Sequence, residues 1–168
     1  MKNYLKASII VLTLASVMVS CKKDDDTAPT GTNNNNNNNP PVENPEFSLQ
    51  LNFQKKEGRN FKAVMKDGTI TINAEIGSIT SPQTLLFYVN AATTGTYVTK
   101  EATDHKIVYA GIYSTQRPEG DGKITISAID TQNKTLSGTF NAIVFEEGKT
   151  VKTYLTEGKM VKIPYTEE

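Results

Sequence analysis

The chain has 168 residues, with 18 basic and 18 acidic side chains, one His, one Cys and no Trp. This length predicts a single domain. The balanced charge argues against nucleic acid as a partner, because nucleic-acid-binding domains carry a basic face. The single Cys excludes a disulfide framework and any Cys-rich metal site, and the single His argues against a His-based metal site or catalytic triad.

The first segment, residues 1–20, has the pattern of a secretory signal peptide. Lys2 and Lys6 form a basic start, and Ala7–Val19 is a run of 13 residues without charge. A membrane-spanning helix needs about 20 apolar residues, so this run is too short to span a bilayer but suits the core of a signal peptide. We expect it to be removed from the mature protein.

The end of that segment, Met18-Val19-Ser20-Cys21, resembles the lipobox of bacterial lipoproteins. The resemblance implies cleavage before Cys21, a diacylglyceryl group on its sulfur and an acyl chain such as palmitate on its new amine. Several acyl chains anchor a protein stably where one would exchange. The expected partner is therefore the outer membrane, reached through Cys21; the alternative is an ordinary signal peptide with an incidental Cys.

The charged residues that follow Cys21 are Lys22, Lys23, Asp24, Asp25 and Asp26. This run resembles the surface-export signal of lipoproteins from Gram-negative Bacteroidota, in which an acidic cluster directs transfer to the outer leaflet. It implies display at the cell surface; the alternative is that these charges only keep the linker solvated. Thr27 stands in Asp26-Thr27-Ala28, which resembles an O-glycosylation site of the same group.

Residues 21–45 read as the lipidated Cys followed by a tether. The tether contains seven consecutive Asn, Asn33–Asn39, and is rich in Pro. Such a segment cannot bury enough apolar surface to offset the entropy of ordering, so it is predicted to be disordered. The domain organisation expected is thus 1–20 signal peptide, 21–45 tether and 46–168 folded domain.

From Glu46 the apolar period is two, as in β-strands. The expected strands are 47–53, 61–65, 69–76, 84–90, 106–113, 123–130, 136–145, 151–156 and 161–165. Turn residues such as Lys66-Asp67-Gly68 separate them, and no stretch has a helical period. We predict an all-β fold, an antiparallel β-sandwich or partly open barrel of eight to nine short strands.

Alternation within two of these strands predicts which side chains share a face. Ile124, Ile126 and Ala128 point one way in their strand, and Phe140, Ala142 and Val144 do so in the next. Gly138 lies inside the second strand. An internal Gly predicts a β-bulge or a close approach of backbone at that position.

Residues 122–165 resemble an uncharacterised domain of Bacteroidota lipoproteins. The motifs that carry the likeness are Gly122-Lys123-Ile124-Thr125-Ile126, Asp130, Ser137-Gly138-Thr139-Phe140 and Glu157-Gly158-Lys159-Met160. The family usually has Phe where Met160 stands. The resemblance implies an all-β lipoprotein domain; it supplies no reaction, no cofactor and no catalytic residue.

The residues themselves give little sign of catalysis. His105 follows an acid, but no Gly-x-Ser-x-Gly turn accompanies it. The acid pairs Glu119 with Asp121 and Glu146 with Glu147 lie in or beside exposed turns, where solvation explains them better than glycoside hydrolysis. We predict no enzyme, no cofactor and no metal site.

Four tyrosines are the candidate ligand-binding residues: Tyr88, Tyr109, Tyr113 and Tyr154. Each is predicted to lie opposite the apolar face of its strand. Exposed aromatic rings stack on sugars or form hot spots for a protein partner; the alternative is that they pack within the sandwich. The sequence therefore predicts a lipid-anchored, non-enzymatic binding module for glycan or nutrient capture. The alternative is a periplasm-facing structural or assembly lipoprotein.

Overall fold

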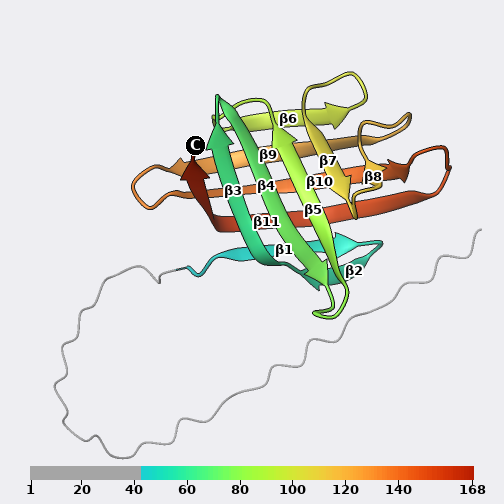
Figure 1. Ribbon diagram of the computed structural model, residues 1–168, viewed down its shortest axis with the longest axis horizontal. Coiled ribbons are helices and arrows are strands. Elements are labelled where there is room, and N and C mark those ends of the chain that lie inside the picture. Colours follow the sequence, from blue (N-terminus) through green and yellow to red (C-terminus); the bar gives the residue numbers. More distant parts are fainter. Residues whose placement is uncertain (1–42) are drawn as a thin grey trace, which may run out of the picture. The chain divides into compact units, whose positions relative to one another are not determined.

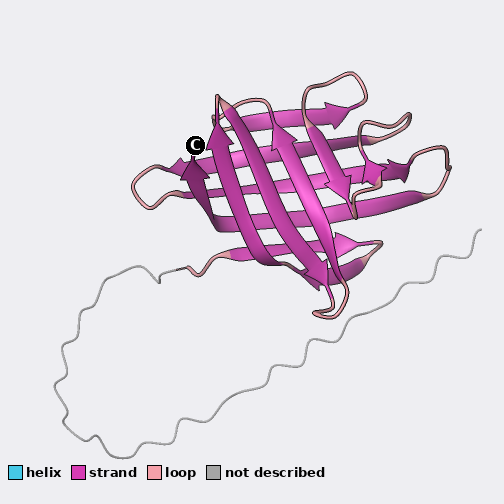
Figure 2. Cartoon of the chain, in the orientation of Figure 1, coloured by secondary structure: helices cyan, strands magenta, loops and turns pink. Residues whose placement is uncertain are grey.

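The computed structural model describes residues 43–168, which form an all-β domain (Figures 1 and 2). Its strands are β1 Glu46–Leu51, β2 Gln54–Glu57, β3 Arg59–Lys66, β4 Thr69–Gly77, β5 Pro82–Val89, β6 Gly95–Lys100, β7 Lys106–Tyr109, β8 Tyr113–Ser114, β9 Asp121–Asp130, β10 Thr135–Glu146 and β11 Lys152–Glu167. The described residues contain no helix, so none of them offers a helical membrane span. The all-β prediction is confirmed.

The signal peptide, the lipidation of Cys21, the export residues 22–26, the modification of Thr27 and nearly all of the tether were predicted within residues 1–42. These residues lie outside the part of the chain that the structure describes.

The strands form one sheet that folds into two layers. The order is β2-β1-β11-β3-β4-β5-β7-β8-β10-β9-β6, and β11 also pairs with β10. A front layer of β3, β4, β5 and β7 crosses a back layer of β6, β9, β10, β11, β1 and β2 (Figure 1). The long β11 joins the layers at one corner and β8 at the other, as in a partly open barrel. The β11–β3 pairing is parallel, the others antiparallel.

The core lies between the layers and is centred on three phenylalanines. The Phe140 ring is 4.6 Å from the Phe87 ring and 5.5 Å from the Phe47 ring, measured between centroids. Aliphatic side chains from both layers surround them. The core belongs to the described residues, as in a domain that folds by itself.

The predicted faces are confirmed at Ile124 and Ile126 and along Phe140, Ala142 and Val144, which are all buried. They are wrong at Ala128, which is exposed. The register of β9 against β10 shifts between Ser137 and Gly138, and this bulge breaks the alternation beyond Ile126. The extra residue is Ser127 of β9, so the bulge lies opposite Gly138 and not in its own strand. The other expectation for Gly138, a close approach of backbone, is confirmed by the adjacent Thr125 carbonyl oxygen.

Eleven strands replace the nine expected. The segments 151–156 and 161–165 are one strand, β11, because the Gly158 backbone lies under the Phe140 ring instead of turning; a Cβ there would be 2.5 Å from Phe140 Cε1. The predicted strand 106–113 divides into β7 and β8 at Ala110, whose φ is 51°. The sequence pattern did not predict the edge strands β2 and β6. An edge strand buries few side chains, so its sequence shows little alternation of apolar and polar residues.

Candidate functional site

The four candidate tyrosines do not form one cluster. Tyr88 lies on the outer face of β5 in the front layer, and Tyr154 lies on the outer face of β11 in the back layer. Tyr109 and Tyr113 lie together, with their rings 5.7 Å apart. The structure therefore offers separate surfaces.

The expected exposure of Tyr109 is wrong. Tyr109 is only 6 % exposed and points into the core with Ile107, which leaves Val108 on the outer face. The predicted strand 106–113 requires the alternation to continue past Ala110, but the chain turns there, so Tyr109 does not face outward. Burial raises the pKa of the Tyr109 hydroxyl, which donates a hydrogen bond to Gln83 Oε1. Tyr109 and the half-buried Tyr113 pack within the structure.

The half-buried Tyr154 forms an aromatic platform with the exposed Phe53. The two rings are 5.5 Å apart, and the Phe53 side chain is 72 % exposed. Lys152 Nζ lies 5.3 Å from the centre of the Tyr154 ring. Hydrogen bonding to the Tyr154 hydroxyl raises the pKa of Lys152.

The turn that carries Phe53 is fixed to β11 by two hydrogen bonds. The Asn52 backbone N–H donates to the Tyr154 carbonyl oxygen, and the Tyr154 N–H donates to Asn52 Oδ1, each over 2.9 Å. The turn and the platform thus move as one unit, and Phe53 is preorganised beside Tyr154.

Phe53 is also held in a strained backbone conformation. Asn52 and Phe53 form a two-residue turn between paired Leu51 and Gln54, with φ angles of 48° and 67°. Hairpin turns with two positive φ angles favour Asn followed by Gly, and a bulky residue there is an outlier that costs about 1–3 kcal/mol. An exposed ring that fills no core position yet occupies a glycine position is a candidate for a role in binding.

Sequence reasoning missed Phe53. The apolar alternation Phe47, Leu49, Leu51 continues to Phe53, which predicted a strand running to 53. The polar run that follows, Gln54-Lys55-Lys56-Glu57, was the available sign that the strand ends before Phe53. This run forms the returning strand β2.

A polar hollow of about 400 Å³ adjoins the platform on the outer face of the back layer. Besides Tyr154 it is lined by Asp121, Lys123, Asn141, Ile143, Thr156 and Glu157. The Gln50 side-chain amide donates to Glu157 Oε2 over 2.6 Å and orients that carboxylate. We call Phe53, Lys152, Tyr154 and this hollow the Phe53–Tyr154 site.

The outer face of the front layer carries a different groove, of about 540 Å³. Its lining combines the apolar Pro82, Leu86, Val108 and Ala110 with the polar Asn73, Gln83 and Thr84, and it has no charged side chain. Tyr88 follows two residues after Leu86 on the same face, and Lys106 Nζ lies 5.5 Å from its ring centre. Unlike the Phe53–Tyr154 site, which has Asp121 and Glu157, this groove has no carboxylate to accept hydrogen bonds from a hydroxylated ligand.

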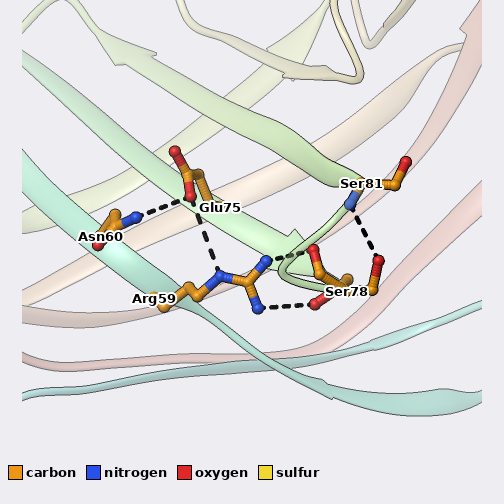
Figure 3. A network of polar contacts seen from close by, with 6 residues as sticks. Arg59, Asn60, Glu75, Ser78 and Ser81 are labelled. Carbon is orange, nitrogen blue, oxygen red and sulfur yellow. Dashed lines mark hydrogen bonds and ion pairs between the residues drawn. The ribbon is translucent and has the colours of Figure 1, made fainter.

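A third hollow, near Lys55, Lys56 and Arg59, is not a free basic site. Arg59 Nη1 donates to the Gly77 carbonyl oxygen over 2.9 Å, and Nη2 donates to the Ser78 carbonyl oxygen (Figure 3). Arg59 Nε lies 4.0 Å from the Glu75 carboxylate. The guanidinium is thus committed to holding the β4–β5 hairpin.

The residues considered for catalysis have structural contacts. His105 Nδ1 accepts a hydrogen bond from the Asn90 N–H, and its ring lies 5.0 Å from Tyr97. Glu146 and Glu147 form ion pairs with Lys149 and Arg117. Within residues 43–168, no group of three or more His, Cys, Asp or Glu side chains is placed to hold a metal ion.

Two crossed β-layers with a shallow aromatic and polar surface site define an all-β domain of sandwich-like architecture. Residues 43–164 match the family described as "Domain of unknown function (DUF6252)", and the chain belongs to this family. The expected membership of an uncharacterised family is thereby confirmed. No curated protein and no solved structure matches the chain.

Proposed function

We propose that this protein is a non-enzymatic binding module that captures glycans at the Phe53–Tyr154 site. The observation that carries the proposal is the combination of an aromatic platform, of which Phe53 is exposed, with a hollow that contains two carboxylates and an amide. The apolar face of a sugar ring stacks on an aromatic ring, and its hydroxyls hydrogen-bond to carboxylates and amides. Asp121, Asn141 and Glu157 supply those groups beside Tyr154.

We also propose that the module is a lipoprotein of Bacteroidota type, anchored in the outer membrane through Cys21 and displayed at the cell surface. The lipobox and the acidic run 24–26 support this. The position of the site agrees with it: the chain enters the domain at the start of β1, and Phe53 lies in the turn beyond the other end of that strand. A tether joined at Glu46 would leave the platform free to meet a ligand.

The binding proposal predicts different results for two Tyr→Ala variants. Fluorescently labelled residues 43–168 are applied to an array of polysaccharides and oligosaccharides. We expect wild type to bind a subset and Tyr154→Ala to lose about tenfold or more in affinity, since stacking and desolvation at a central aromatic ring often contribute 2 kcal/mol or more. Tyr88→Ala is the matched control on the other layer and should bind as wild type. Absence of any glycan binding, or loss in Tyr88→Ala alone, would refute this assignment.

The display proposal is tested on intact cells with a protease that does not penetrate the outer membrane. We expect the wild-type domain to be cleaved, and the variant with Asp24, Asp25 and Asp26 all changed to Ala to be protected until the cells are lysed. If both proteins are protected in intact cells, the domain faces the periplasm. That result would favour the alternative role in envelope structure or assembly.

A further inference from the structure

The sheet ends in two edge strands, β2 and β6, and these differ in how they are protected. An edge strand presents unpaired backbone groups that invite another strand, and charged side chains are a common defence. Three of the four residues of β2 are charged: Lys55, Lys56 and Glu57. In β6 the only charged residue is the last, Lys100. The β6 edge therefore lacks the protection that β2 has.

The free part of the β6 edge is short and well defined. The Lys100 N–H donates to Thr103 Oγ1 over 3.1 Å, and the Lys100 carbonyl oxygen accepts from the Thr103 N–H over 3.0 Å. The backbone of Lys100 thus faces away from β9 and is capped by the following loop. Because β6 pairs with β9 without a register shift and backbone groups alternate in an antiparallel pair, the N–H and C=O of Thr96 and Val98 also face outward.

The outward N–H and C=O groups of Thr96 and Val98 have no backbone or side-chain partner within residues 43–168. The Val98 side chain at this edge is 39 % exposed. The other large hydrophobic side chains exposed in the described part of the chain are Phe53, Ile79, Ile112 and Val151, and all of these lie in turns or loops. Val98 is the exception that lies in a strand, and that strand is the unprotected edge.

We propose that a second copy of this chain pairs antiparallel with β6, about a two-fold axis that passes beside Tyr97. In this register Thr96 of each copy is opposite Val98 of the other. A hydrogen-bonded antiparallel pair exchanges two N–H···O bonds, so the two pairs satisfy all the outward groups of Thr96 and Val98 in both copies.

A second copy fits this edge because a two-fold interface needs a self-complementary surface. Thr96 and Val98 lie on the same outer face, so each exposed Val98 side chain would pack against a Thr96 side chain, a pairing of two β-branched residues that stabilises sheets. Lys100 would be opposite Thr94 of the other copy, so no like charges face each other. The two back layers would become one continuous sheet.

Sedimentation of residues 43–168 over a concentration series tests the pairing. We expect a reversible dimer of wild type. Val98→Lys should raise its dissociation constant about tenfold or more, because both copies lose the apolar contact with Thr96 and gain an ammonium group in its place. The matched control is Val151→Lys, the same change at a 57 % exposed position away from β6, and it should dimerise as wild type. A wild type that stays monomeric throughout, or a Val98→Lys variant that dimerises equally well, would overturn the proposal.

Cross-linking tests the register. Residues 43–168 contain no Cys, so Thr96→Cys and Val98→Cys can be introduced in separate chains. Directly opposed hydrogen-bonded residues have Cα atoms about 5.5 Å apart, within the range that a disulfide spans. Under mild oxidation the mixture of the two variants should form the disulfide faster than either variant alone, and faster than Thr96→Cys mixed with Val151→Cys. Equal rates in all mixtures would rule out this register.

Discussion

Replacing Gly138 with Ala is expected to prevent the domain from folding stably. A Cβ at this position would lie 2.1 Å from the Thr125 carbonyl oxygen and 3.1 Å from Met160 Cε. The Thr125 carbonyl cannot move away, because β9 is paired with β10 on one side and β6 on the other. We expect a loss of more than about 3 kcal/mol, a large share of the roughly 5–15 kcal/mol that stabilises a domain. Urea unfolding followed by circular dichroism measures it.

The control for this substitution is Gly111→Ala. Gly111 has a φ of 74°, and a Cβ there would meet nothing within 4 Å. It should therefore lose only the strain of an Ala at positive φ, about 1 kcal/mol. If Gly138→Ala unfolds at the same urea concentration as wild type, the close approach of β9 and β10 at the bulge is not as the structure has it.

Replacing Phe53 with Gly is expected to separate stability from binding. Glycine relieves the strain of a positive φ at the second turn position, which stabilises the domain by about 1–3 kcal/mol. Two effects oppose this gain: the contact with Tyr154 is lost, and glycine has a larger entropy in the unfolded chain. Each of them costs about 0.5–1.5 kcal/mol. The gain and the two losses are of the same size, so the variant should melt close to the wild-type temperature. Its affinity for a glycan bound by wild type should fall about tenfold or more, because half of the stacking platform is gone.

Calorimetric melting and glycan titration of the same sample measure both effects. Ile79→Gly is the matched control, since Ile79 is an 85 % exposed apolar residue in the loop between β4 and β5 and does not line the Phe53–Tyr154 site. It should leave binding unchanged. A Phe53→Gly variant that binds as wild type but melts well below it would mean that Phe53 has a structural role and not a binding role.

The sequence by itself determined the fold class and most of the strands. Period-two alternation is a local property, and it gave the correct inner faces around Ile124, Ile126 and Phe140, because burial of one sheet face selects for it. The close approach of backbone at Gly138 was also predictable, because Gly inside a strand leaves space for a neighbouring strand that a Cβ would fill.

Tertiary structure decided the features that depend on which strands meet. Alternation does not say where a strand ends, so Phe53 was placed in a strand although it is an exposed turn residue, and Tyr109 was placed outside although it packs inside. The unprotected edge of β6 is a property of sheet order, which no local pattern contains. The polar hollow draws Asp121, Asn141 and Glu157 from three strands. Their proximity follows from pairing between distant segments, and only the folded chain shows it.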